Sequence, residues 1–302
     1  MTRVSLMIET WNLGDELARV ERDLWELVDG VAGQVAAAGA EVVITHRGLS
    51  ERARTSIERA LAGSITWIEL AVDAGYYEHK NRGFDATTGE IVAFLDGDCR
   101  PSSSWLASLI APIDRGQARV VAGLTSYPGE LAELANQLDF PYWDHGPGNV
   151  RNFFANNVAF ARDVFADRRY PSIAPMFHGQ CQVLGLRLIT EGIDVRFAPG
   201  ARVTHAWPED LREWLEVRLL RGADTVSLLP YVVATYAPAA SPVVAQLGPL
   251  PALAILGLRA VTGTWAALRR GPVVRGLGLV AAVTILDAIG AAAAPAVYRR
   301  IG

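Results

Sequence analysis

The chain has 302 residues, 51% of them hydrophobic and 20% charged, and a formal net charge of −4. This acidic balance, without a basic stripe interleaved with aromatic residues, argues against nucleic acid as a partner. The two cysteines, Cys99 and Cys181, have no metal-motif spacing and are expected to be free thiols.

Apolar residues are unevenly distributed along the chain. Residues 1–225 look globular and carry nearly all the acidic residues, whereas the remainder is rich in Ala, Leu, Val, Gly and Pro and its charges are almost all arginines. We therefore expect a globular domain at 1–225 and a hydrophobic, helical, membrane-associated region at 226–302. The first apolar run is too short for a signal peptide and contains Glu9, so we expect the globular domain on the cytoplasmic side of the cell membrane.

Strands and helices alternate in the first half of the chain. Strands are predicted at 4–8, 41–45, 66–71, 91–95 and 119–122, and helices at 15–38, 51–61, 77–88 and 102–110. The alternation favours an α/β fold with a parallel or mostly parallel sheet covered on both faces. The second half is less regular, with helices predicted at 180–191 and 209–222 and short extended pieces at 195–198 and 202–205.

Two carboxylates, Asp96 and Asp98, follow the strand at 91–95 with Gly97 between them. Such a pair suits a hard divalent cation, which can neutralise a diphosphate. An isolated Asp-Gly-Asp is more often a simple polar turn, and the flanking sequence is what favours the functional interpretation. Glu9, Thr45 and Asp96 all lie at predicted carboxyl ends of strands, where ligands of parallel sheets bind, so we expect them to line one crevice.

The flanking sequence, KNRGFDATTGEIVAFLDGDCRPSSSWL, resembles the central signature of the family 2 glycosyltransferases, which have the nucleotide-sugar-binding GT-A fold. Four further segments resemble family elements in the expected order: SLMIETWN, ANNVAFARDVF, HGQCQVLGLRLITEGIDVRFAPGARVTHAWP and LEVRLLRGAD. The resemblance covers roughly residues 3–223. It implies a mostly parallel central sheet with helices on both faces, and transfer of a sugar from a nucleotide-sugar donor to an acceptor hydroxyl with inversion.

The resemblance also implies roles for individual residues. Asp98 would bind Mg²⁺ or Mn²⁺, His205 would add a metal contact, and Asp96 would face the ribose and base of the donor. The other expected contacts to the donor are made by Glu9, Thr10, Lys80, Arg82, Asn156, Arg218 and Arg221. Lys80 and Arg82 fit equally well as solvated charges. Arg218 and Arg221 also fit an alternative role as anchors next to a membrane.

Two departures from the family pattern affect the expected chemistry. The second strand runs into Thr45-His46-Arg47 where the family carries acidic residues, so the nucleotide stays open. The acceptor helix begins His178-Gly179-Gln180-Cys181 where the family has Gly-Glu-Asp, so the usual carboxylate base is missing. His178 is one replacement, although it also fits a structural or acceptor-positioning role. Alternatively Asp139 or Asp144 reaches in, or the acceptor needs no strong base.

The hydrophobic region contains two segments, 227–258 and 277–297, that are each long enough to cross a bilayer. Arginines at both ends of the second segment leave its orientation open. Two helices lying in the membrane interface fit almost as well. A soluble helical subdomain or a dimer interface is the alternative without a membrane, and Asp287 argues against a simple span. We expect membrane lipids to be partners.

The sequence thus favours a metal-dependent glycosyltransferase that acts on a hydroxyl-bearing acceptor at or near the membrane, with lipid-linked acceptors among the candidates. The alternative is a non-catalytic nucleotide-sugar-binding or scaffold protein on a degenerate transferase fold, which the missing base carboxylate motivates. A nucleotidyltransferase is disfavoured, because no glycine-rich, Arg- or Lys-containing phosphate loop follows the first strand.

Overall fold

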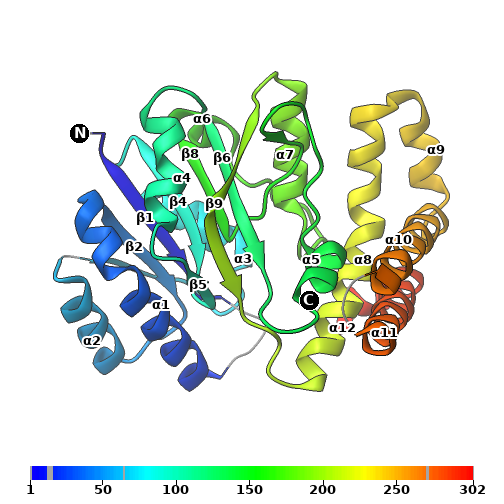
Figure 1. Cartoon of the computed structure of the whole chain (residues 1–302), viewed down its shortest axis with the longest axis horizontal. Coiled ribbons are helices and arrows are strands. Elements are labelled where there is room, and N and C mark those ends of the chain that lie inside the picture. Colours follow the sequence, from blue (N-terminus) through cyan, green and yellow to red (C-terminus); the bar gives the residue numbers. More distant parts are fainter. Residues whose placement is uncertain (1, 12–15, 64, 270–271, 302) are drawn as a thin grey trace. The chain divides into compact units, whose positions relative to one another are not determined.

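The computed structural model describes residues 2–11, 16–63, 65–269 and 272–301 (Figure 1). The chain forms two compact units that alternate along the sequence. The sheet unit comprises Met1–Thr125, Tyr142–Ser172 and Glu191–Ala206, and the helical unit comprises Ser126–Pro141, Ile173–Thr190 and Trp207–Gly302.

The sheet unit is built on a mixed sheet with the strand order β3-β2-β1-β4-β8-β6-β9-β5, and β7 also pairs with β9. The neighbours β3, β2, β1 and β4 run parallel, and β8 pairs antiparallel with β4 and β6. This arrangement confirms the expected α/β class. The strands are β1 (Val4–Glu9), β2 (Glu41–His46), β3 (Ile65–Glu69), β4 (Ile91–Asp96), β5 (Cys99–Pro101), β6 (Val120–Ser126), β7 (Asn149–Val150), β8 (Asn157–Ala161) and β9 (Val195–His205).

The described residues of the sheet unit form the helices α1 (Leu17–Ala38), α2 (Glu51–Leu61), α3 (Tyr76–Asp85), α4 (Trp105–Asp114) and α6 (Arg162–Arg168). Helix α1 buries Leu24, Leu27, Val28 and Val31, whose spacing of three and four residues places them on one face. Helix α3 approaches the sheet closely at Gly83, where a Cβ would lie 2.3 Å from the Met7 side chain. This close approach brings the side chains of α3 to the carboxyl ends of the central strands.

The sequence predictions fit the sheet unit with two instructive differences. The predicted pieces at 195–198 and 202–205 form one strand, β9, which continues through Pro199 and Gly200. Its pairing with β7 at Val195 and with β5 at His205 explains this continuity. Helix α3 ends at Asp85 instead of at Thr88, and Asp15, the first residue of the first predicted helix, lies outside the described residues.

The helical unit contains α5 (Ala132–Asp139), α7 (Gln180–Thr190), α8 (Leu211–Tyr236), η1 (Pro238–Ala240), α9 (Ser241–Gln246), α10 (Leu250–Arg269), α11 (Val273–Ala292) and α12 (Ala294–Ile301). Helix α8 begins at the Asp210 cap, whose carboxylate accepts the backbone N–H of Glu213, and continues well beyond the predicted end at Gly222. The predicted apolar segment 227–258 is therefore divided among the end of α8, η1, α9 and the start of α10.

Within the part of the chain that the structure describes, two helices, α10 and α11, are long and apolar enough to cross a membrane. Length and composition alone are weak support, because core helices of soluble proteins pass the same test. In the helical unit α11 packs against α8 with almost no space between backbones. A Cβ at Gly222 would lie 2.0 Å from the Asp287 carbonyl oxygen, and one at Gly290 would lie 2.1 Å from that of Leu219.

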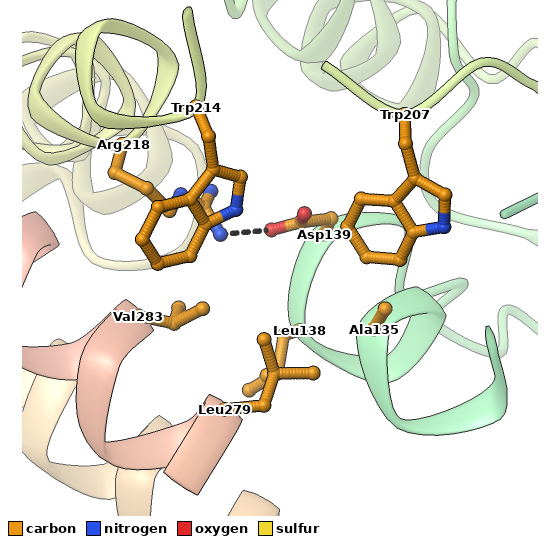
Figure 2. A pocket seen from close by; sticks show the side chains of 8 residues that line it. All are labelled: Ala135, Leu138, Asp139, Trp207, Trp214, Arg218, Leu279 and Val283. Carbon is orange, nitrogen blue, oxygen red and sulfur yellow. Dashed lines mark hydrogen bonds and ion pairs between the residues drawn. The ribbon is translucent and has the colours of Figure 1, made fainter. Parts of the chain in front are cut away.

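A cluster of buried charges lies beside this contact. Arg218 approaches Asp139 of α5 at 2.8 Å and Asp287 of α11 at 3.2 Å, and its side chain is only 2% exposed. Arg221 pairs with Asp139 at 3.0 Å, and Arg259 of α10 pairs with Asp287. Figure 2 shows Arg218 and Asp139 pointing toward each other in a small cavity, with Trp207, Trp214, Leu279 and Val283 also in its lining.

Candidate functional site

The carboxyl ends of β1, β2 and β4 bring three of the predicted site residues together. Glu9 pairs in register with Asp96 on one side and with Thr45 on the other. The Thr10 hydroxyl donates to the Thr45 carbonyl at 2.9 Å. Glu9 is completely buried, and burial together with the neighbouring Asp96 raises its pKa well above the usual range. Burial therefore favours the protonated, neutral form of the Glu9 carboxyl group.

Helix α3 supplies both partners of the Asp96 carboxylate. The Lys80 ammonium lies 2.5 Å from one oxygen, and the Tyr76 hydroxyl donates to the other at 2.7 Å. Lys80 is completely buried and Asp96 is only 4% exposed. Arg82, by contrast, is exposed and lies 3.8 Å from Glu78 on its own helix. Of the two predicted cations of α3, only Lys80 reaches the carboxyl ends of the strands.

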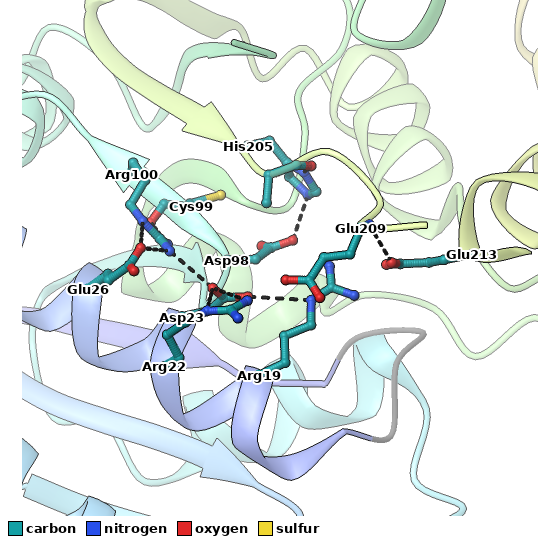
Figure 3. A network of polar contacts seen from close by, with 11 residues as sticks. Arg19, Arg22, Asp23, Glu26, Asp98, Cys99, Arg100, His205, Glu209 and Glu213 are labelled. Atoms are coloured by element: carbon teal, nitrogen blue, oxygen red, sulfur yellow. Dashed lines mark hydrogen bonds and ion pairs between the residues drawn. The ribbon is translucent and has the colours of Figure 1, made fainter. Parts of the chain in front are cut away.

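Asp98 and His205 face each other because β5 pairs antiparallel with β9, which aligns Cys99 with His205. The Asp98 Oδ2 lies 3.4 Å from the His205 Nε2 (Figure 3). The other ring nitrogen, Nδ1, lies 2.8 Å from the Ala206 carbonyl, to which it can only donate. In a neutral ring with its proton on Nδ1, the Nε2 atom has a lone pair that faces the Asp98 carboxylate. Two hydrogen-bond acceptors then face each other, so a cation or a second proton must lie between the His205 Nε2 and the Asp98 Oδ2.

The donor atoms around Asp98 fit a hard divalent cation. Asp98 is 4% exposed, and within the described residues its Oδ1 has no hydrogen-bond partner. Ligand atoms of Asp98, Cys99 and His205 lie within 4.8 Å of one another. Burial and the two aspartates raise the pKa of the Cys99 thiol, and a neutral thiol is a poor ligand for Mg²⁺ or Mn²⁺. Asp98 and His205 are thus the residues suited to hold the ion, as the family resemblance implies.

A network of ion pairs on α1 and β5 lies next to Asp98 (Figure 3). Asp23 lies 3.6 Å from Arg19, one turn away, and 3.2 Å from Arg100 of β5, which also pairs with Glu26. These contacts fasten the short strand that follows Asp98 to α1. The sequence interpretation missed Asp23, for which the four-residue spacing from Arg19 was the only available signal.

Asn157, the first residue of β8, and Asn156, the residue before it, have different surroundings. Asn157 accepts the Trp105 indole N–H at 2.8 Å and donates to the Ala201 carbonyl at 3.0 Å, so it links β8, α4 and β9. Asn156 is 4% exposed and accepts the Thr125 hydroxyl at 3.0 Å. Asn157 is thus a structural residue, and Asn156 remains the predicted donor contact.

In the helical unit, His178 lies just before α7 and is held by Asp224 of α8. The backbone N–H groups of Phe177 and His178 donate to the Asp224 carboxylate at 2.9 and 2.7 Å. The His178 Nδ1 lies 3.5 Å from the Asp224 Oδ2. The Tyr298 hydroxyl of α12 donates to Asp224 at 2.8 Å. Asp224 lies 46 residues from His178 in sequence, and no local pattern indicated this pairing.

The other residues expected near the chemistry have quite different environments. Burial alone would raise the pKa of Asp139, but Arg218 and Arg221 outweigh it and lower that pKa, which makes Asp139 a weak base. Asp144 is exposed in a loop of the sheet unit, where its main chain bridges to Val150. Both arginines are engaged by buried carboxylates, and their expected contact with the donor remains a prediction.

The sequence profile described as "Glycosyl transferase family 2" matches residues 17–167. Two curated relatives come from Haloferax volcanii. The chain is 30% identical to the glycosyltransferase AglE over 86 residues, which is 28% of each chain. It is 29% identical to a glucosyl-dolichyl phosphate glucuronosyltransferase over 100 residues, 29% of this chain and 31% of the relative. The aligned part is therefore less than a third of either relative.

Solved structures share the fold at low sequence identity. A mannosyltransferase from Pyrobaculum calidifontis, in complex with GDP-Man and Mn²⁺, is 17% identical, and the match covers 95% of this chain and 86% of that one with a TM-score of 0.59. A glucosyl-3-phosphoglycerate synthase from Mycobacterium tuberculosis is 16% identical over 78% of each chain, with a TM-score of 0.51. The fold is thus that of the GT-A glycosyltransferases, and the chain belongs to glycosyl transferase family 2.

Proposed function

We propose that the chain is a metal-dependent glycosyltransferase that moves a sugar from a nucleotide-sugar donor to an acceptor hydroxyl at or near the membrane, with inversion. The observation that carries this proposal is the pair of Asp98 and His205, two buried or half-buried ligands whose lone pairs converge beside the carboxyl end of β4. The Mn²⁺ bound to the mannosyltransferase of similar fold supports the same role here.

The charges around the site support a diphosphate ligand. Asp96 and Asp98 supply two carboxylates and Lys80 supplies one ammonium, so these three residues have a net charge of −1 when all are ionised. A bound Mg²⁺ or Mn²⁺ would reverse this sign and would stabilise the negative charge of the departing nucleoside diphosphate. Thr10, Asn156 and Asp96 are proposed to contact the donor beside the ion.

His178 is the proposed general base for the acceptor hydroxyl. It immediately precedes Gly179-Gln180-Cys181, which stands where the family has Gly-Glu-Asp, and its ring is half-buried. Asp144 remains the second candidate, since it is an exposed carboxylate in a loop. A lipid-linked acceptor is proposed from the dolichyl phosphate in the name of one relative. Association with the membrane is proposed from α10 and α11, and the cytoplasmic side from the sequence interpretation.

The proposal is tested with the full chain in detergent or vesicles. Candidate nucleotide sugars are first screened by thermal shift with Mn²⁺, and donor turnover is then measured for the parent and for Asp98→Asn. We expect the variant to lose the Mn²⁺-dependent part of donor affinity and at least about a hundredfold in turnover. Asp167→Asn, which alters a 76% exposed carboxylate of α6, is the matched control. Equal Mn²⁺ dependence in Asp98→Asn and in the parent would remove the metal assignment.

A second candidate function is a non-catalytic protein that binds nucleotide sugars. It is favoured by one observation, the His-Gly-Gln-Cys sequence where the family carries its base carboxylate. Both functions give donor binding with Mn²⁺, and only the enzyme gives turnover. Tight donor binding without hydrolysis or transfer, across the lipid-linked and soluble acceptors tried, would support the binding protein.

A further inference from the structure

The outward sides of α10 and α11 are apolar although they are exposed. The exposed positions recur every three or four residues, so each helix presents one continuous apolar side. A helix exposed to water normally carries polar residues there, and soluble monomers rarely expose such large apolar patches. Exposed members of this side are Leu258 (66%), Val261 (67%) and Trp265 (57%) on α10, and Val274 (84%), Ile285 (58%) and Ile289 (51%) on α11.

The opposite sides of the two helices pack against α5 and α8, and this cover is most extensive on α11. Leu138 of α5 contacts Gly263 of α10, and Leu134 contacts Gly276 of α11. At its first turn α11 pairs with the residues before α5, because Arg275 lies 2.8 Å from Glu130. Near its end, α11 holds the buried ion pair with Arg218 and touches the backbone of α8. Protein therefore covers one side of the hairpin from the first turn of α11 to its last.

This covering decides between crossing a bilayer and lying on it. Helix α11 has 20 residues and is about 30 Å long, which is the full thickness of the hydrocarbon layer. If it crossed the bilayer, the elements along its side would have to enter the hydrocarbon too. Helix α5 carries an exposed charge, Glu133, and α8 carries Glu216 and Arg221, which are half-buried. Exposed charges are very costly at that depth.

We propose that the hairpin of α10 and α11 lies flat in one leaflet, with its apolar side toward the acyl chains and its covered side toward the protein. This inference rests on the membrane association in the proposed function. Charge complementarity identifies the partner as a bilayer with anionic headgroups, because Arg269, Arg299 and Arg300 are exposed near the ends of these helices. The Arg269 guanidinium lies 3.9 Å from the centre of the Trp265 ring, a pair typical of the membrane interface.

The orientation is tested by labelling in sealed vesicles. The parent must first float with vesicles containing anionic lipid; failure to float would sink the membrane association itself. Single cysteines then replace Arg275, which is 71% exposed at the first turn of α11, and Arg299, which is exposed on α12 after the end of α11. The native cysteines are buried and set the background. We expect an impermeant thiol reagent to label both positions from the same side. Labelling of Arg275→Cys only from the other side would overturn the flat arrangement.

A second measurement tests the lipid-facing side directly. Leu258→Glu is expected to weaken partitioning into the same vesicles by about tenfold or more, because a lipid-facing leucine becomes a charge. Leu211→Glu is the matched control, since Leu211 is 69% exposed and belongs to α8, outside the hairpin. Equal partitioning of the two variants would overturn the proposal. A stable dimer that does not bind vesicles would assign the apolar side to a second copy of the chain instead.

The helical unit carries a second inference, which rests on the proposed role of His178 as the base. Asp224 holds the main chain at His178 by two N–H bonds and also faces the ring Nδ1 at 3.5 Å. Asp224 is 5% exposed, and its own position is fixed by the Tyr298 hydroxyl of α12. Contacts of this kind are often long before substrate binds and tighten in the reacting complex.

We infer that Asp224 is a positioning residue for His178, with Tyr298 as its support. The acceptor oxygen forms a bond to the anomeric carbon of the sugar, whose bond to the diphosphate oxygen breaks, and the diphosphate leaves with the electron pair. The acceptor proton moves to the His178 Nε2. Asp224 favours the tautomer that carries its proton on Nδ1 and stabilises the imidazolium that forms. The last helix of the chain thus contributes to the reaction through Tyr298.

The test compares turnover with donor affinity and reads the His178 tautomer by nitrogen NMR, assigned with His178→Gln. Asp224→Asn is expected to reduce kcat about a hundredfold, to leave the donor Kd within about twofold, and to shift the tautomer. Tyr298→Phe should act in the same direction more weakly, and it serves if Asp224→Asn does not fold. The control is Thr225→Ala, which removes a hydroxyl that donates to the Arg221 carbonyl.

Each outcome separates the inference from the proposed function. An unchanged kcat and an unchanged tautomer in Asp224→Asn or Tyr298→Phe would overturn the positioning role, even if the parent is an active enzyme. A parent without turnover on the donors that bind would overturn the proposed function. The tautomer measurement needs no turnover, so it would still decide whether Asp224 orients the ring.

Discussion

Arg218 can either stabilise the helical unit or bind the donor diphosphate. The two roles predict different donor affinities for a variant in which both Arg218 and Asp287 are replaced. The buried cluster contains three arginines and two aspartates. Removing Asp287 leaves three cations and one carboxylate, whereas removing Arg218 leaves two of each. Breaking a buried ion pair by removing one partner costs about 3–5 kcal/mol. We therefore expect Asp287→Leu to fall near the upper end of that range and Arg218→Met near the lower end.

The combined variant, Arg218→Met with Asp287→Leu, should be more stable than the sum of its parts. Replacing a buried ion pair by apolar residues is often neutral or stabilising, so we expect a coupling free energy of at least about 2 kcal/mol. Hydrogen exchange of the α8 and α11 amides of the full chain in detergent measures local opening free energies directly. Arg212→Met, which alters an exposed ion pair, should leave the exchange unchanged.

Donor affinity of the combined variant then separates the two roles. If Arg218 is structural, the stabilised variant binds donor as the parent does. If Arg218 contacts the diphosphate, affinity falls by tenfold or more although stability has returned. A loss of less than about 1 kcal/mol in Arg218→Met would refute the structural reasoning, because it would mean that this side chain does not neutralise the two buried carboxylates.

Three further outcomes are expected. Gly222→Ala should disrupt the contact of α8 with α11 and lower the midpoint of thermal unfolding, whereas Gly278→Ala, which meets no atom within 4 Å, should be neutral or stabilising. Burial, with Arg47 and Lys80, lowers the pKa of His79 to about 3. As the pH falls below about 6.5, the unfolded chain therefore binds a proton at this histidine that the folded chain does not bind. Stability is thus complete above pH 6.5 and falls with decreasing pH by up to about 1.4 kcal/mol per unit, and His79→Leu should reduce this slope in urea unfolding. Chelation of divalent cations should abolish donor turnover, and added Mn²⁺ should restore it; activity that persists after chelation would contradict the metal requirement.

The sequence was sufficient to predict the positions of candidate site residues that follow directly from a neighbouring strand or motif. The strand before Asp96 and Asp98 is buried and ends where the apolar run ends, so the position of both carboxylates could be predicted. The family pattern also indicated His205, and the pairing of β5 with β9 brings it to Asp98. The proposed role of Asp96 and Asp98 could not be derived from periodicity alone, because a simple polar turn after a strand has the same local sequence.

Contacts between distant segments were not predictable in the same way. From the sequence, Asp287 was only an argument against a membrane span. Its ion-pair partners, Arg218 and Arg259, lie on other helices, so the sequence did not reveal them. The end of α8 was misplaced because the hydrophobic composition changes near Ser227, whereas helical geometry continues to Tyr236. Hydrophobic composition indicates the environment of a helix, and it does not indicate the residue at which the helix ends.

The position of β9 in the sheet has a consequence for biosynthesis. This strand lies between β6 and β5, so the order of the sheet is completed only after Val195–His205 has left the ribosome. About a hundred residues separate Asp98 from its partner His205, and at roughly 5–20 residues per second their synthesis takes about 5–20 seconds. Throughout that interval the nascent chain lacks His205, so the proposed cation site at Asp98 and His205 is incomplete until this late strand has been translated and added to the sheet.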